Sequence, residues 1–113
     1  MENSTTFLDP HTLSVIRGAG TTKTYPAGVP LTNQGEVENT FYVIDSGHAV
    51  VLRRMGDGEE RVLDTLGPRQ SFGELALIDN SSRLATVETL TETTVLEVTA
   101  DQFKELLRND PDL

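Results

Sequence analysis

The stretch FGELALIDNSSRLATV, from Phe72 to Val87, carries the most distinctive pattern of this chain. Arg83 is its single basic residue, and no other Lys or Arg occurs between Gln70 and Phe103. The same span holds a set of acidic residues: Glu74, Asp79, Glu88, Glu92, Glu97 and Asp101. A lone cation in acidic surroundings, nine residues after a Gly-Glu step, indicates a charge reserved for one task, which we interpret as holding a phosphate.

The residues around Gly73 predict an anion site at the start of a short helix. Glu74-Leu75-Ala76-Leu77 are good helix formers that follow an extended approach. The first-turn amides, here those of Glu74, Leu75 and Ala76, have no partner inside the helix and carry the positive end of its dipole. Gly73 has no side chain, so a ligand can approach the backbone closely.

Arg83 and Glu74 extend this interpretation to a nucleotide. A guanidinium can donate to two phosphate oxygens at once. An ionised Glu74 only accepts hydrogen bonds, which suits a sugar hydroxyl better than a phosphate. The alternative is a surface ion pair between Glu74 and Arg83, which would contribute about 0–1 kcal/mol. The small and apolar residues around the two favour a formed site.

The stretch resembles the phosphate-binding cassette of the cyclic nucleotide-binding domain family, the type found in catabolite activator protein and in protein kinase A regulatory subunits. The matching residues are Phe72-Gly73-Glu74-Leu75-Ala76-Leu77 and Arg83, Ala85, Thr86 and Val87. The resemblance continues at Tyr25-Pro26-Ala27-Gly28, Phe41-Tyr42-Val43-Ile44, Gly47 and Leu66-Gly67-Pro68, and covers roughly residues 7–113. It implies that Glu74 takes the ribose 2′-hydroxyl and Arg83 the cyclic phosphate. The amides around Leu75, Ala76 and Ala85 would take the other phosphate oxygens.

The resemblance also implies a base pocket, with Val51 and Leu66 in its wall. Asp64 shares a strand face with Val62 and Leu66 in the expected alternation, so its carboxylate can face the base. A carboxylate accepts from the amino group of adenine and repels the acceptors of guanine, and Leu84 offers guanine no hydroxyl. We therefore expect cAMP rather than cGMP as ligand. The alternative is that Asp64 points to solvent.

Composition excludes several function classes. The net charge of −9 and the pI of about 4.5 argue against direct nucleic-acid binding and against anionic membranes. No apolar run is long enough to span a bilayer, and a chain without cysteine has no disulfide framework. Two scattered histidines, His11 and His48, do not supply a metal site or a cupin-like active site. We expect a cytoplasmic binding protein without metal and without enzymatic activity.

Short strands separated by frequent turn signals predict a mainly β fold with short flanking helices. The expected architecture is a double-stranded β-helix of the jelly-roll or β-roll type. The expected strands cover residues 21–25, 29–32, 40–44, 49–54, 61–66, 84–90 and 94–98. Asp9-Pro10 predicts the start of a first helix, and Thr99 with Gln102 forms a capping-box pattern for a last one.

The expected organisation is a flexible N-terminus over residues 1–8 and one domain over residues 9–113, without the lid helix that usually follows in the family. Leu84 stands where the family commonly has Ala, Ser or Thr, and its bulk can crowd the base. These departures leave open a second function, in which the same fold serves as a protein-interaction module without nucleotide binding. The effector controlled by the domain stays unassigned.

Overall fold

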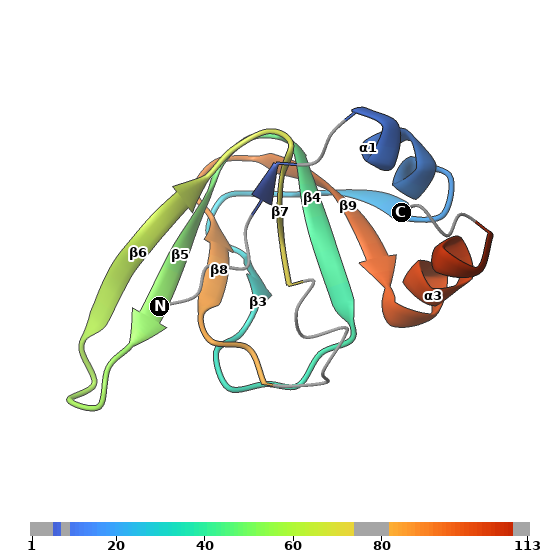
Figure 1. The fold of residues 1–113 in the computed structure, drawn as a ribbon. Coiled ribbons are helices and arrows are strands. Elements are labelled where there is room, and N and C mark those ends of the chain that lie inside the picture. Colours follow the sequence, from blue (N-terminus) through green and yellow to red (C-terminus); the bar gives the residue numbers. More distant parts are fainter. Residues whose placement is uncertain (1–5, 8–9, 74–81, 110–113) are drawn as a thin grey trace.

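The computed structural model describes residues 6–7, 10–73 and 82–109, and two antiparallel sheets form its framework (Figure 1). One sheet has the order β1-β7-β4-β9-β2, and the other has the order β3-β8-β5-β6. The strands are β1 (Thr6–Phe7), β2 (Thr21–Tyr25), β3 (Pro30–Thr32), β4 (Thr40–Ser46), β5 (Ala49–Arg54), β6 (Glu60–Leu66), β7 (Gln70–Phe72), β8 (Thr86–Thr89) and β9 (Thr93–Thr99). The expected mainly β class with short flanking helices is confirmed.

Two helices, α1 (Pro10–Arg17) and α3 (Ala100–Asn109), lie together at one end of the molecule (Figure 1). The predicted capping box begins α3: Gln102 N donates to Thr99 Oγ1 at 3.2 Å, and Thr99 N donates to Gln102 Oε1 at 2.9 Å. Both bonds satisfy backbone donors of the first turn, which is why the helix starts at this point.

The core has two parts, and β4 contributes to both. Its alternate residues Tyr42 and Ile44 face the space between the sheets, where they meet Leu31, Ala49, Val51, Leu66, Phe72, Val87 and Val95. Phe41 and Val43 face the other way, toward Ile16, Leu96, Val98 and the apolar side of α3. A strand covered on both faces needs apolar residues at consecutive positions, which explains the run Phe41-Tyr42-Val43-Ile44.

The strand bounds differ from the expectation mainly around the cassette. The strand expected over residues 84–90 forms only from Thr86 to Thr89, and Leu84 precedes it with 51% of its surface exposed. Thr6 and Phe7, within the segment expected to be flexible, pair with Ser71 and Gln70 of β7.

Candidate functional site

Arg83 lies inside the molecule, with 6% of its surface exposed. Its Nη1 donates to the carbonyl oxygen of Gly73 at 2.9 Å, and its Nη2 donates to the carbonyl oxygen of Thr40. Its Nε donates to Oε1 of Glu38 at 3.3 Å. A guanidinium has five N–H donors, and three of them are used within the described residues. The fork is therefore held in one place and faces the end of β7.

The loop between β3 and β4 fixes the backbone of Arg83 as well. Arg83 N donates to Glu36 O at 2.8 Å, and Gly35 N donates to Arg83 O at 2.9 Å. Glu38 is itself held, because its Oε2 accepts a bond from Asn33 N at 3.4 Å. One short loop thus positions both the main chain of Arg83 and the carboxylate beside its side chain.

Gly73 leaves the space that the guanidinium fills. A Cβ at this position would overlap Nη1 of Arg83 and lie 3.1 Å from its Cζ. The backbone of Gly73 also has φ +94°, a conformation that residues with a side chain rarely adopt. Gly73 is therefore required by its own backbone and by the neighbouring arginine.

The rest of the expected cassette is described only in part. Glu74, Leu75 and Ala76 lie outside the described residues, so their expected contacts stay predictions. The alternative of a surface ion pair does not fit Arg83, because its side chain is only 5% exposed and its carboxylate partner among the described residues is Glu38. Ala85 is half-buried and packs against the core between the sheets.

A row of four side chains crosses the inner face of the four-stranded sheet. Thr32 pairs with Val87, Val87 with Val51, and Val51 with Asp64. Cross-strand partners share a face, so the expected base-pocket residues Val51 and Asp64 lie side by side. Leu66, also expected there, is two residues beyond Asp64 and 1% exposed. Asp64 is half-buried, and its Oδ1 accepts a bond from Thr65 N at 2.8 Å.

Two β-bulges decide which residues belong to this row. In β6 the pairing moves from Val51 with Asp64 to Leu52 with Val62, so Leu63 is the extra residue. Val62 therefore lies on the opposite face from Asp64 and is 64% exposed. The expectation that Asp64 and Val62 share a face was wrong, because one extra residue reverses the alternation.

The second bulge lies in β3, between Pro30 and Thr32, where Leu31 is the extra residue. Leu31 and Thr32 are both buried, at 8% and 2% exposed. The hydroxyl of Thr32 has no hydrogen-bond partner among the described residues. A buried hydroxyl without a partner costs about 1–3 kcal/mol.

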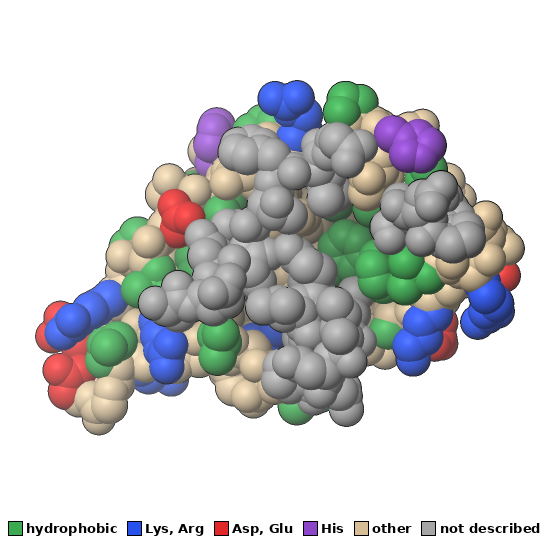
Figure 2. All heavy atoms as spheres, viewed as in Figure 1, with side chains coloured by type: hydrophobic (Ala, Val, Ile, Leu, Met, Phe, Trp, Pro, Cys, Tyr) green, Lys and Arg blue, Asp and Glu red, His purple; other side chains and the backbone are tan. Residues whose placement is uncertain are grey.

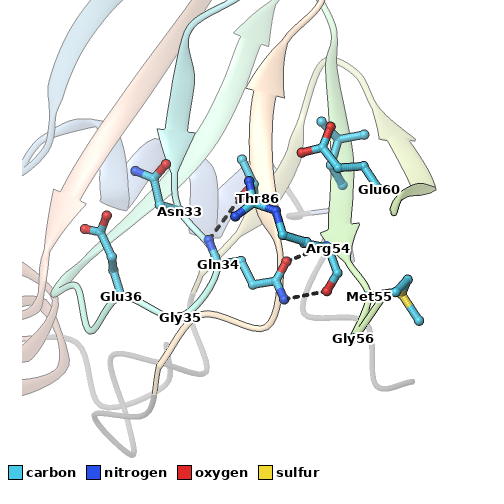
Figure 3. A pocket seen from close by; sticks show the side chains of 10 residues that line it. Asn33, Gln34, Gly35, Glu36, Arg54, Met55, Gly56, Glu60 and Thr86 are labelled. Carbon is cyan, nitrogen blue, oxygen red and sulfur yellow. Dashed lines mark hydrogen bonds between the residues drawn. The ribbon is translucent and has the colours of Figure 1, made fainter. Parts of the chain in front are cut away.

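A pocket of about 490 Å³ lies on the other side of the same sheet (Figure 3). Its lining includes Leu52 and Thr86, which are cross-strand partners facing away from Val51 and Val87. Gln34 reaches across it: its Nε2 donates to Arg54 O at 3.1 Å, and its Oε1 accepts from Arg54 N at 2.6 Å (Figure 3). These bonds tie the loop that holds Arg83 to the end of β5.

Comparison with known proteins gives this site its context. The family model described as "Cyclic nucleotide-binding domain" matches residues 22–110. The chain belongs to the cyclic nucleotide-binding domain family. This confirms the resemblance on which the cassette interpretation was based.

Relatives of this cyclic nucleotide-binding domain include bacterial and eukaryotic proteins. The cyclic AMP receptor protein of Thermus thermophilus is 33% identical over 87 residues, which cover 77% of this chain and 40% of that protein. A cAMP-dependent protein kinase regulatory subunit of Schizosaccharomyces pombe is 38% identical over 106 residues, which cover 94% of this chain and 25% of that protein. The chain thus spans less than half the length of these two relatives.

Solved structures confirm the fold of the domain. The crystal structure of Thermus thermophilus catabolite activator protein superposes with a TM-score of 0.83 and 30% identity, covering 92% of this chain and 49% of that chain. The regulatory domain of Toxoplasma gondii PKA, crystallised with cAMP, gives a TM-score of 0.78 and 32% identity, covering 90% of this chain and 39% of that chain.

Charges of both signs act on Tyr42, which packs against the core between the sheets. Burial raises the pKa of Tyr42 to about 12, helped by the charges of Glu97 and Glu38 and opposed by that of Arg83. Tyr42 therefore stays a neutral donor and bonds Leu31 O at 3.0 Å.

Figure 2 shows charged side chains of both signs over the β5–β6 hairpin. At physiological salt such surface charges are screened within about 8 Å, so the local site governs anion binding.

Within the described part of the domain, no group of three or more His, Cys, Asp or Glu side chains is arranged to hold a metal ion. None of the described helices is both long and apolar enough to cross a membrane.

Sequence reasoning missed three features of the domain: Glu38, the Thr40 carbonyl and Thr32. Glu38 and Thr40 are 45 and 43 positions from Arg83. The lone cation was the signal that could have led to Glu38, because a buried cation needs a carboxylate partner. Thr32 offered no signal, because only the bulge in β3 turns its side chain inward.

Proposed function

We propose that this domain is a regulatory module that binds cAMP. Arg83 binds the cyclic phosphate together with the amides around Leu75, Ala76 and Ala85, and Glu74 binds the ribose 2′-hydroxyl. The observation that carries the proposal is the buried guanidinium of Arg83, fixed beside Gly73 at the start of the cassette. A guanidinium can donate to two phosphate oxygens at once, so the cyclic phosphate can replace the partners that Arg83 has without ligand.

The proposed base pocket uses Val51 and Leu66 as its apolar wall and Asp64 as its polar residue. Asp64 supports adenine because it shares the inner face with Val51, and a carboxylate accepts a hydrogen bond from an exocyclic amino group. The names of the bacterial and kinase relatives, which refer to cAMP, also favour this ligand.

The proposed output is a population shift that involves α3. Thr40, whose carbonyl accepts from Arg83, pairs with Thr99 immediately before α3. Ala100, the first residue of α3, donates from its N to Asn39 O at 2.7 Å. Asn39 lies between Glu38 and Thr40, which both bond Arg83. A phosphate that draws the guanidinium away from these two residues would loosen the segment on which α3 begins. We propose only the kind of effector: a protein segment or domain that contacts α3.

Calorimetric titration with cAMP and cGMP tests the proposal. We expect saturable binding of cAMP, weaker binding of cGMP, and at least about a tenfold loss of cAMP affinity in Arg83→Ala. Arg61→Ala is the matched control, because Arg61 is exposed on β6 and pairs only loosely with Glu59, at 3.8 Å. Asp64→Asn should reduce the difference in affinity between cAMP and cGMP.

The second candidate function is a protein-interaction module that keeps the fold without binding a nucleotide. The exposed Leu84, at 51%, is the observation that favours it. Thermal denaturation separates the two functions, because a ligand at 100 times its dissociation constant stabilises the folded state by about 2.7 kcal/mol. An unchanged melting temperature with both nucleotides would favour the interaction module.

A further inference from the structure

Thr32 carries the one buried polar side-chain atom among the described residues that lacks a hydrogen-bond partner. We propose that its Oγ1 donates a hydrogen bond to an oxygen at the sugar–phosphate end of the bound cyclic nucleotide. The inference rests on the proposed nucleotide-binding function and adds to it a contact residue outside the cassette.

The missing bond is unusual for a buried threonine in this protein. Thr89 and Thr93 are buried to the same degree, at 1% and 0% exposed. Thr89 Oγ1 donates to Pro26 O at 2.7 Å, and Thr93 Oγ1 donates to Thr91 O at 2.9 Å. Valine has nearly the shape of threonine and would fill the position of Thr32 without burying an unused hydroxyl. A hydroxyl retained in this position therefore points to a partner that joins later.

The backbone is shaped to turn this side chain inward. Pro30 pairs with Glu88 and Thr32 with Val87, so Leu31 is inserted between them. If pairing continued from Pro30 without a bulge, Leu31 would pair with Val87 and Thr32 with Thr86. Thr32 would then face the opposite side of the sheet, where the pocket of Figure 3 lies. Bulges that re-aim a side chain are common beside binding sites.

Hydrogen bonds place Thr32 at the Arg83 end of the inner row. The next residue, Asn33, donates from its N to Oε2 of Glu38 at 3.4 Å, and Oε1 of the same carboxylate accepts from Arg83 Nε. Asp64 lies at the other end, three strand spacings or about 14 Å away. One functional group cannot reach both ends, so Asp64 suits the base and Thr32 the sugar–phosphate. A hydroxyl that donates to a phosphate oxygen makes a charge-assisted bond.

The test compares Thr32→Val and Thr32→Ser by calorimetric titration with cAMP and cGMP, alongside urea denaturation without ligand. We expect Thr32→Val to weaken the binding of cAMP and of cGMP by about tenfold each. The two factors should be similar, because the contact does not involve the base. Its free energy of unfolding should be equal to or above that of the unsubstituted protein, because no bond is lost. Thr32→Ser keeps the hydroxyl and should stay within about threefold of the original affinity.

Thr93→Val is the matched control, because it removes a hydroxyl that has partners far from the row. It should lower the free energy of unfolding and leave the affinity of the folded protein unchanged. If Thr32→Val destabilises the protein without ligand as Thr93→Val does, the hydroxyl already has a partner and the inference is wrong. Equal affinity in Thr32→Val and the unsubstituted protein would also overturn the inference. So would a Thr32→Val variant that binds only one of the two nucleotides more weakly. Failure of the unsubstituted protein to bind either nucleotide would instead refute the proposed function itself, and the inference with it.

Discussion

Nη1 of Arg83 lies 2.9 Å from the carbonyl oxygen of Gly73, in the volume that a side chain on Gly73 would occupy. The absent side chain of Gly73 thus makes room for Arg83 even when no ligand is bound. Gly73 follows the last residue of β7 and has a left-handed backbone conformation. The guanidinium packs directly against its backbone. Two residues ten positions apart are therefore fitted to each other within the protein itself.

Gly73→Ala should destabilise the protein more than an ordinary glycine substitution. Alanine at a positive φ costs about 1–2 kcal/mol, and the overlap with Arg83 adds about 1–3 kcal/mol. Gly28→Ala is the control, because Gly28 has φ +84° but a Cβ on it would meet no atom within 4 Å. Urea denaturation measures both. Equal losses in the two variants would show that the contact with Arg83 adds nothing.

Glu38→Gln should lower the free energy of unfolding. It should also increase the stabilisation that cAMP gives to the folded protein. Removing the charged partner of a buried guanidinium costs about 1.5–3 kcal/mol, less than for a fully enclosed pair, because the Glu38 side chain is 22% exposed. Under the proposed function the cyclic phosphate supplies the lost negative charge. The rise in melting temperature with cAMP should then be larger in Glu38→Gln than in the unsubstituted protein.

Glu36→Gln provides the control for this prediction. Glu36 lies in the same loop but bonds Arg83 and Asn33 through its backbone only, as far as the described residues show. Its substitution should change stability by less than about 0.5 kcal/mol. A Glu38→Gln variant as stable as Glu36→Gln would contradict the importance of the ion pair.

Stability should fall in alkaline solution as the two tyrosines titrate. Burial raises the pKa of Tyr42 to about 12, and burial with a hydrogen bond to Glu97 raises the pKa of Tyr25. The folded state thus favours the neutral phenols. Their contribution is complete below about pH 10, the unfolded value, and is lost as the pH rises through the folded values.

Two measurements check this pH dependence. Urea denaturation should give a lower free energy of unfolding near pH 11 than near pH 9, and tyrosinate absorbance of the folded protein should rise only well above pH 10. The chain has two tyrosines and no tryptophan, so the signal is simple to interpret. Tyrosinate absorbance with a midpoint near pH 10 in the folded protein would contradict the prediction.

Thr99→Ala should cost about 1 kcal/mol, because it removes the capping hydroxyl at the start of α3. Thr99→Ser keeps the bond to Gln102 N and should cost about half of that or less. Circular dichroism during urea denaturation measures both. If alanine and serine behave alike, the cap contributes no stability and α3 is held by its apolar face alone.

Much of the fold and part of the candidate site were predictable from local sequence patterns. The positions of all strands except β1 and β7, the helix after Asp9-Pro10 and the capping box at Thr99 each depend on neighbours within a few positions. Membership of the family also followed from a continuous stretch, because Gly73 and Arg83 belong to one cassette. The cassette contacts of Glu74, Leu75, Ala76 and Ala85 remain predictions.

Local sequence patterns predict an acidic β-domain whose cassette carries a glycine and, ten positions later, a single arginine. The partners that hold this arginine depend on the packing of the two sheets, because Glu38 and Thr40 reach it across more than forty positions. The tertiary structure also decided which side chains face the inner row. A single inserted residue in β3 and another in β6 reverse the faces of Thr32 and Val62, and no residue type in those strands announces a bulge.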